Sequence, residues 1–142
     1  MELMDELMDV VSIFLRHKGK YLILKRSSKV TTFKNVWGSV SGRIEKKDWD
    51  DIETSMREIE EETGIKRDQL KFIKKGRPFH LAAEGRKWCV HPMLFESSTD
   101  KVVLNSENTE YAWISREELK NYKTVEKLNI TLARVANNGK SP

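Results

Sequence analysis

The sequence predicts a single α/β domain in which helices pack around a mixed sheet. Three observations support this prediction. Strand-like apolar segments and two amphipathic helical segments follow one another along the chain. The chain contains no internal repeat or low-complexity tract. Its 142 residues suit one domain with a buried core. We expect this domain to span residues 1–136 and the tail, residues 137–142, to be disordered.

The first strands are expected at Val10–Leu15 and Tyr21–Leu24, which are rich in branched and aromatic residues. The polar link His17–Gly19 makes them a hairpin. A long polar loop then runs from Ser27 to Gly42 and leads into a short strand near residues 41–44. The order of these segments indicates that the sheet begins with an antiparallel pair.

A helix is expected to follow, capped by Asp48 or Asp50 and ending near Thr63, where Gly64 supplies a left-handed stop. Its buried face is given by apolar positions at helical spacing, namely Ile52, Met56, Ile59 and Thr63.

Longer strands are expected at Leu70–Ile73 and Lys87–Glu96, followed by a short one at Glu110–Ile114. The first two are separated by Arg77-Pro78 and by Glu84-Gly85. A capping-box pattern from Ser115 to Glu118 opens a short helix. Thr124 is expected to cap a final amphipathic helix that carries Val125, Leu128, Leu132 and Val135.

The charge is unevenly distributed. The net charge is +4, yet acidic residues crowd residues 45–62, while Lys and Arg dominate residues 66–87. A basic surface around an acidic pocket would attract polyanions such as nucleotides. Binding to nucleic acid is compatible with this charge but has no further support, because the aromatic residues form no stacking-platform motif. Ordinary solvated charge is the alternative for each Lys or Arg.

The chain is expected in the cytoplasm. No apolar run approaches the roughly 18–20 residues needed to span a bilayer, so no membrane partner is predicted. The acidic N-terminus is unlike the basic start of a secretory signal. The single cysteine, Cys89, cannot form an internal disulfide, which favours a reducing compartment.

The acidic helix is the candidate metal site. Glu58, Glu61 and Glu62 fall within roughly 100° of one another on the helix surface and are expected to face outward together. They repel one another and oppose the helix dipole, and both penalties reverse if a divalent cation binds among them. Oxygen ligands select a hard ion, Mg²⁺ or Mn²⁺. Arg57 can orient Glu58, whereas Glu60 points elsewhere. A solvated acidic face remains the alternative.

The run from Arg57 to Ile65, led by Gly42, resembles the signature of the Nudix (MutT-like) hydrolases. That signature is Gly, five residues, Glu, seven residues, then Arg-Glu-apolar-any-Glu-Glu-any-Gly-apolar. Its second half matches at every specified position. Comparable features elsewhere extend the resemblance over nearly the whole chain, namely Lys25-Arg26, Trp37 and Glu110–Ile114.

The first half of the signature departs from the pattern. Gly42 lies one residue farther from Arg57 than the signature specifies. Counting back from Arg57 gives Trp49 where the signature has glutamate, and counting forward from Gly42 gives Asp48. One inserted residue would reconcile both counts, with Asp48 standing in for the missing acid.

The resemblance implies an α/β/α sandwich with a mixed sheet and a catalytic loop-helix-loop. It also implies magnesium-dependent hydrolysis of a nucleoside diphosphate linked to another group, by attack of water on phosphorus. Glu58 and Glu62 would be the principal metal ligands, Glu61 a ligand or a partner of metal-bound water, and the Gly42 carbonyl a further ligand. Arg57 would orient the glutamates. Homodimers are common in the family.

In the family the general base often comes from a loop just before a Trp-bearing strand. Glu107, six residues before Trp113, fits that place best, and Glu110 is second. Ordinary surface charge is the alternative for both acids.

Candidate phosphate-binding residues are Arg43, which directly follows the glycine loop, then Arg26 and Arg77, with Arg86 last. His80, His91 and Cys89 are expected to be structural rather than catalytic.

Two other functions are alternatives to diphosphate hydrolysis. A nucleotide-binding or protein-interaction module of the same fold, with weak or no turnover, is favoured by the shifted Gly42 and the missing upstream glutamate. A diphosphate isomerase fits poorly, since those relatives use a cysteine ahead of the signature and Cys89 follows it.

Overall fold

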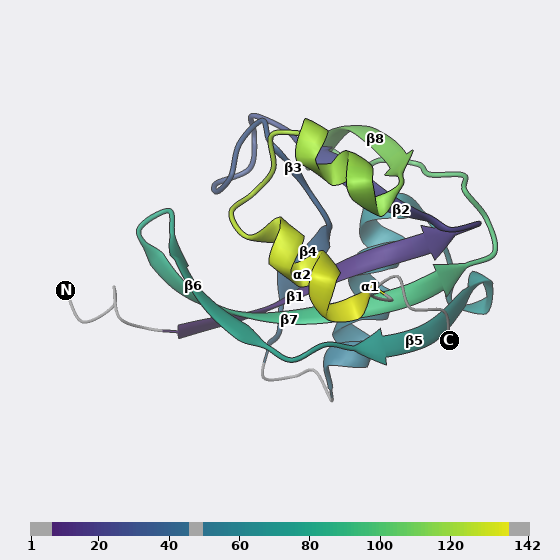
Figure 1. Cartoon of the computed structure of the whole chain (residues 1–142), viewed down its shortest axis with the longest axis horizontal. Helices are drawn as coiled ribbons and strands as arrows, with labels where there is room; N and C mark the ends of the chain where they lie inside the picture. Colours follow the sequence, from purple (N-terminus) through teal and green to yellow (C-terminus); the bar gives the residue numbers. More distant parts are fainter. Residues whose placement is uncertain (1–6, 46–49, 137–142) are drawn as a thin grey trace.

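The computed structural model describes residues 7–45 and 50–136. Asp48, Trp49 and the expected tail therefore lie outside the described residues. Eight strands form one mixed sheet with the order β3-β2-β1-β7-β5, to which β4, β6 and β8 add by pairing with β1, β7 and β2 (Figure 1). The strands are β1 (Leu7–His17), β2 (Lys20–Arg26), β3 (Trp37–Gly38), β4 (Val40–Arg43), β5 (Leu70–Lys75), β6 (Phe79–Ala83), β7 (Arg86–Ser97) and β8 (Asn108–Ile114).

The centre of the sheet is the parallel pair of β1 and β7, which runs from Leu7 opposite Lys87 to Arg16 opposite Glu96. All other strand pairs are antiparallel, so the sheet is mixed, as predicted. The predicted β1–β2 hairpin is confirmed, and Lys18 and Gly19 at its turn both have positive φ. No strand was expected at residues 79–83, where the structure has β6, which returns into β7 through Glu84-Gly85.

Helix α1 (Asp51–Thr63) has the predicted ends. The Asp50 carboxylate accepts a hydrogen bond of 2.8 Å from the Glu53 amide, so Asp50 is the N-cap. At the other end Gly64 adopts φ 76° and donates to the Glu60 carbonyl. Both signals are local, which is why the sequence predicted them.

The start of the last helix was predicted wrongly. Helix α2 (Leu128–Val135) begins four residues after Thr124, and Lys127 occupies its N-cap position. The reason is tertiary: Trp37 forms backbone hydrogen bonds with both Lys123 and Val125, which hold the Thr124 segment extended against β3. Ahead of it lies a short 3₁₀ helix (Arg116–Asn121).

The sheet lies between α1 and α2, which cover opposite faces (Figure 1). Side chains of β1 alternate, so that Val11, Ile13 and Leu15 pack with Ile59 of α1. Phe14 packs on the other face with Leu132 of α2. This arrangement is the predicted α/β/α sandwich. Within the described ranges no helix has the length and apolar character needed to cross a membrane.

Candidate active site

Two carboxyl groups one helical turn apart, Glu58 and Glu62, form the centre of the candidate site. Glu62 is only 3% exposed, and the Glu58 side chain is 15% exposed. A hydrogen bond joins the two carboxyl groups. Glu62 Oε2 is buried and has no hydrogen-bond partner among the described residues. A buried, unpartnered carboxyl oxygen is costly, so this position favours a cationic ligand.

The expectation that three glutamates face outward together is corrected. Glu61 is exposed, but Glu62 is turned into the protein. The buried face of α1 is wider than its apolar residues indicate, because Thr54 and Ser55 are also fully buried. Their hydroxyl groups donate to helix carbonyls one turn earlier, which satisfies them inside the protein.

Gly42 of β4 packs directly on Glu58. A Cβ atom placed on Gly42 would overlap the Glu58 carboxyl group, so only glycine leaves room for it. Helix α1 is continuous from Asp51. The extra residue between Gly42 and Arg57 therefore does not separate Gly42 from Glu58.

Burial raises the pKa of Glu62 well above its ordinary value. The hydrogen bond to Glu58 and the negative charges of Glu58 and Glu107 raise the pKa further, while Arg26 opposes them. Burial also raises the pKa of Glu58, although the Glu62 hydrogen bond and Arg57 act against this. Arg57 Nη2 lies 3.7 Å from Glu58 Oε2 as an ion pair. The hydrogen bond raises the pKa of Glu62 and lowers that of Glu58, so a proton shared by the pair is favoured on Glu62, which donates it to Glu58.

The metal-free protein is expected to lose stability through Glu62 as the pH rises. Because the pKa of Glu62 is raised by folding, the folded state binds more protons than the unfolded chain between the two pKa values. The stabilisation is complete below the pKa of glutamate in the unfolded chain, about 4.3. It is lost as the pH rises through the raised pKa of Glu62 in the folded protein. Melting temperatures in EDTA should fall more steeply with pH for the wild type than for Glu62→Gln. Equal pH profiles for the two proteins would contradict this assignment.

Glu107 and Arg26 lie close enough to Glu62 for their charges to act on its carboxyl group. The Glu107 carbonyl accepts a hydrogen bond of 2.8 Å from the Ser27 amide, which fixes the Glu107 loop beside the end of β2. Its charge contributes to the raised pKa of both Glu58 and Glu62. Arg26 is partly buried, and burial lowers its pKa while Glu62 and Glu107 oppose this. Glu110 instead lies opposite Lys25 in the β2–β8 ladder and pairs with it at 3.6 Å.

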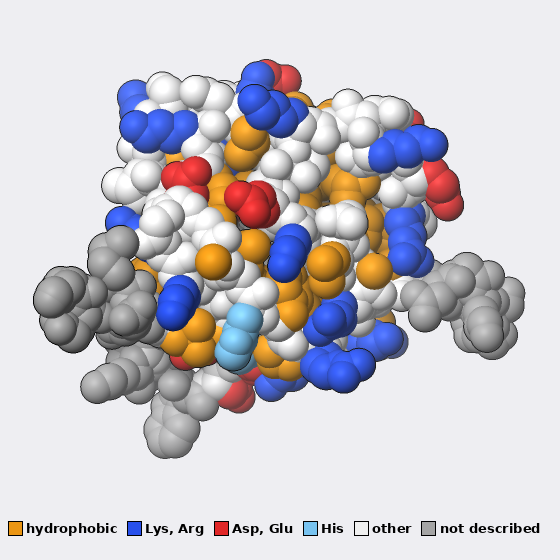
Figure 2. Space-filling view, turned by 60° about the vertical axis from the view of Figure 1, so that its left-hand side comes forward, with side chains coloured by type: hydrophobic (Ala, Val, Ile, Leu, Met, Phe, Trp, Pro, Cys, Tyr) orange, Lys and Arg blue, Asp and Glu red, His pale blue; other side chains and the backbone are white. Residues whose placement is uncertain are grey.

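A pocket of about 360 Å³ adjoins this cluster. Arg26, Gly42 and Glu107 line the pocket; Gly42 packs on Glu58, and the charges of Arg26 and Glu107 act on Glu62. Figure 2 views the molecule from the side of the β6–β7 hairpin and shows acidic side chains flanked by Lys and Arg side chains and by hydrophobic ones. The arginines that line the pocket, Arg26, Arg43 and Arg86, suit it to an anionic group.

Three of the four candidate arginines line this pocket, namely Arg26, Arg43 and Arg86. Arg77 does not line it, and its carbonyl instead accepts a hydrogen bond from Arg134. The sequence ranked Arg86 last because it gave no sign that the β6–β7 hairpin forms one wall of the pocket.

Aromatic residues form another part of the wall. The rings of Phe33 and Trp88 lie 6.1 Å apart, and both residues line the pocket. Trp88 also packs in a hydrophobic cluster with Leu81 and Val90 and donates to the Ala83 carbonyl, as expected for a buried tryptophan. Phe33 holds a positive φ of 54° in the long loop. Phe33 was not among the binding residues that the sequence predicted.

A family model described as "NUDIX domain" matches residues 6–135. Two solved structures resemble the chain over most of its length. A C. elegans Ap4A hydrolase is 18% identical, with a TM-score of 0.75, covering 89% of this chain and 93% of that one. The MutT protein from Methanosarcina mazei Go1 is 22% identical, with a TM-score of 0.76, covering 92% and 93%.

A third structure, a NUDIX-family hydrolase from Clostridium perfringens, is 16% identical, with a TM-score of 0.70, covering 90% of this chain and 97% of that one. A search of curated proteins by sequence gives no significant match. Identities this low show a shared fold only, whereas the family model spans nearly the whole described chain. This chain belongs to the Nudix family.

Proposed function

We propose that the chain is a magnesium-dependent hydrolase that cleaves the diphosphate linkage of a nucleoside diphosphate joined to another group, by attack of water on phosphorus. The observation that carries the proposal is Glu62, a buried carboxyl with one unpartnered oxygen, hydrogen-bonded to Glu58. A purely solvated acidic face would not bury one of its carboxyl groups against a second.

The donor set fits a hard divalent cation. Glu58 and Glu62 would be the principal ligands, with the exposed Glu61 and the Gly42 carbonyl as further oxygen donors. Oxygen-only ligands favour Mg²⁺, with Mn²⁺ as a substitute. A bound cation would neutralise phosphate charge and lower the pKa of an attacking water. Arg57 would keep Glu58 oriented through the ion pair described above.

We assign the general base to Glu107. It lines the pocket, it is exposed, and it lies close enough to Glu58 and Glu62 to raise their pKa. A carboxylate placed beside the attacking water can accept its proton.

Phosphate recognition would come from Arg26, Arg43 and Arg86, the arginines of the pocket wall. Arg77 is left out of this proposal because it does not line the pocket. Phe33 and Trp88 offer an apolar, aromatic surface for the remainder of a nucleotide. The combination suits a nucleotide with several phosphates, since cationic and aromatic groups share one pocket.

The proposal is tested with a panel of ADP-ribose, dinucleoside polyphosphates, oxidised nucleotides, nucleotide sugars and capped RNA ends. Each is incubated with Mg²⁺ or with EDTA, and released phosphate or mononucleotide is measured. We expect at least one compound to be cleaved with Mg²⁺ and none with EDTA. Metal-dependent binding of a panel member without product would instead support the alternative, a Nudix-fold nucleotide-binding module.

Glu107→Gln is expected to lower kcat about 100-fold or more, the usual contribution of a general base. Glu110→Gln is the matched control from the same segment, because Glu110 pairs with Lys25 and lines none of the described pockets. It should keep nearly full activity. The kcat of both variants is measured at saturating Mg²⁺. An equal loss of kcat in the two would show that Glu107 is not the general base.

A further inference from the structure

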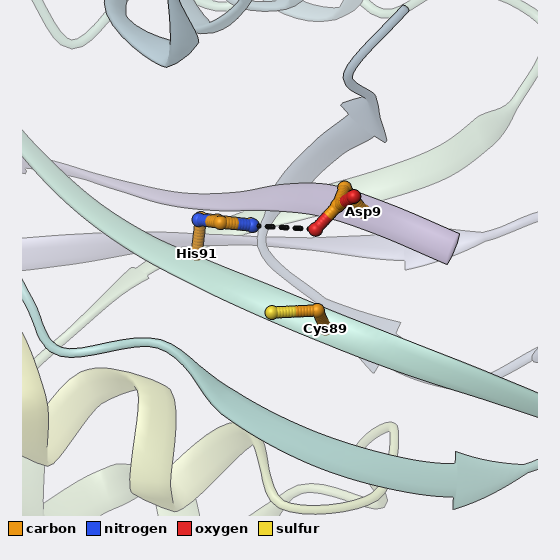
Figure 3. Close-up of side chains that lie close together, drawn as sticks. All are labelled: Asp9, Cys89 and His91. Atoms are coloured by element: carbon orange, nitrogen blue, oxygen red, sulfur yellow. Dashed lines mark hydrogen bonds and ion pairs between the residues drawn. The ribbon is translucent and has the colours of Figure 1, made fainter. Parts of the chain in front are cut away.

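A second group of potential metal ligands lies on strands β1 and β7, outside the signature helix. Asp9 of β1 and Cys89 and His91 of β7 point toward one another from neighbouring parallel strands (Figure 3). In the β1–β7 register Asp9 lies opposite Cys89, and His91 follows two residues later on the same face. Trp88 and Val90, which alternate with Cys89 and His91, line the pocket. The group is therefore on the sheet face opposite the pocket.

The spacing of these side chains suits a small cation. One ligand atom from each residue lies within 4.8 Å of the other two, and His91 Nε2 is 3.0 Å from Asp9 Oδ1. Ligand atoms around a tetrahedral zinc ion stand about 3.3–3.8 Å apart, given bonds of roughly 2.0–2.3 Å. The three atoms therefore need only small side-chain rotations to surround one ion.

The hydrogen bonding of this group is incomplete as it stands. His91 Nδ1 is buried and has no partner among the residues that the structure describes. A thiol binds a metal as the thiolate, so a cation at Cys89 would take the place of the thiol proton.

A fourth ligand is available on the next strand. His80 of β6 lies directly opposite Cys89 in the antiparallel β6–β7 register, and its side chain is exposed. Residues paired in this way share a face, with Cβ atoms about 4.5–5.5 Å apart. Two of the three histidines of the chain and its single cysteine thus gather on one patch. The third histidine, His17, bonds the Ser97 carbonyl elsewhere.

We propose that Asp9, Cys89 and His91 bind Zn²⁺ or a chemically similar transition-metal cation, with His80 as the fourth ligand. Sulfur, imidazole and carboxylate donors together select such ions over Mg²⁺, which prefers oxygen. The ion would join β6, β7 and β1 on the face away from the pocket. Sequence reasoning treated the histidines and the cysteine singly as structural, since only the strand register brings them together.

Cobalt titration tests the site. CoCl₂ is added to the Glu62→Gln protein, whose signature site is weakened, and the thiolate-to-cobalt absorption band is recorded. Because Cys89 is the only thiol in the chain, the band can come only from Cys89. We expect one equivalent to bind, ZnCl₂ to displace it and excess MgCl₂ to leave it in place. His91→Ala should weaken binding about 10–100-fold or more, and His80→Ala should also weaken it. His17→Ala is the matched control and should not.

Absence of the band, unchanged affinity in His91→Ala, or half an equivalent of cobalt per chain would overturn the proposal. The last result would mean that the cation joins the cysteines of two chains. A measurement on the unmodified protein avoids any folding defect of the variants. Zn²⁺ should slow the reaction of Cys89 with a thiol reagent, and an unchanged rate would refute the site. The diphosphate hydrolase proposal does not depend on either outcome.

Discussion

Glu62→Gln is expected to lower kcat/KM with Mg²⁺ about 100-fold or more and to raise the melting temperature of the metal-free protein. Substitution of a residue that only hydrogen-bonds to a metal ligand lowers metal affinity or activity about 10–100-fold. Glu62 is proposed to bind the metal directly, so its loss should cost at least as much. The same side chain is buried with an unpartnered oxygen and a raised pKa. Glutamine removes the charge while it can still donate a hydrogen bond to Glu58.

At a pH where Glu62 is charged, the gain in stability should be about 1–3 kcal/mol, since a buried charged group without a partner costs at least this much and glutamine stays neutral. For a domain of this size that is several degrees of melting temperature. Glu60→Gln is the matched control, because Glu60 lies on the same helix but is exposed and pairs with Lys66 at 3.6 Å. Glu60→Gln should change neither kcat/KM nor the melting temperature of the metal-free protein appreciably. Full activity in Glu62→Gln would remove Glu62 from the site.

Gly42→Ala is expected to lower kcat/KM about 100-fold with little change in stability. The added methyl group would overlap the Glu58 carboxyl group. Because that carboxyl is the end of a flexible side chain, it can move aside without unfolding the protein, but it then leaves its place beside Glu62. Displacement of a reacting group by about 1 Å can cost roughly 100-fold in rate.

Gly38→Ala in β3 is the control for Gly42→Ala. A Cβ atom at Gly38 would meet Val125 at 3.5 Å and Arg26 Cδ at 4.0 Å, which are ordinary contact distances. Gly38→Ala should therefore keep the rise in melting temperature that Mg²⁺ produces, and Gly42→Ala should lose most of it. If both variants respond to Mg²⁺ like the wild type, Gly42 does not position Glu58.

Local signals in the sequence were sufficient to predict helix α1. Its cap at Asp50, its stop at Gly64 and the glutamates one turn apart depend on residues close together in the chain. The burial of Glu62 could not be predicted in this way. Glu62 lies on the same side of the helix as Thr54 and Ser55, and this side is buried although its residues are polar.

Contacts between distant segments explain the other differences. Thr124 is a good capping residue, but backbone pairing of its neighbours with Trp37 keeps it extended. Arg86 reaches the pocket because β6 and β7 form a hairpin there, and Phe33 reaches it from the long loop. Residue type and spacing alone carry no information on such pairings. The register of β1 and β7 that brings Asp9 close to Cys89 and His91 is also a pairing of distant segments, so residue type and spacing did not predict it.

The central claim is that a divalent cation binds between Glu58 and Glu62. Thermal melting with increasing MgCl₂ tests it most directly, with wild type and Glu62→Gln measured side by side. A ligand that binds only the folded state stabilises it by about 2.7 kcal/mol at 100 times its Kd. The melting temperature of the wild type should therefore rise steadily with Mg²⁺, while that of Glu62→Gln stays nearly constant. No rise in the wild type at millimolar Mg²⁺, or an equal rise in both proteins, would contradict the claim.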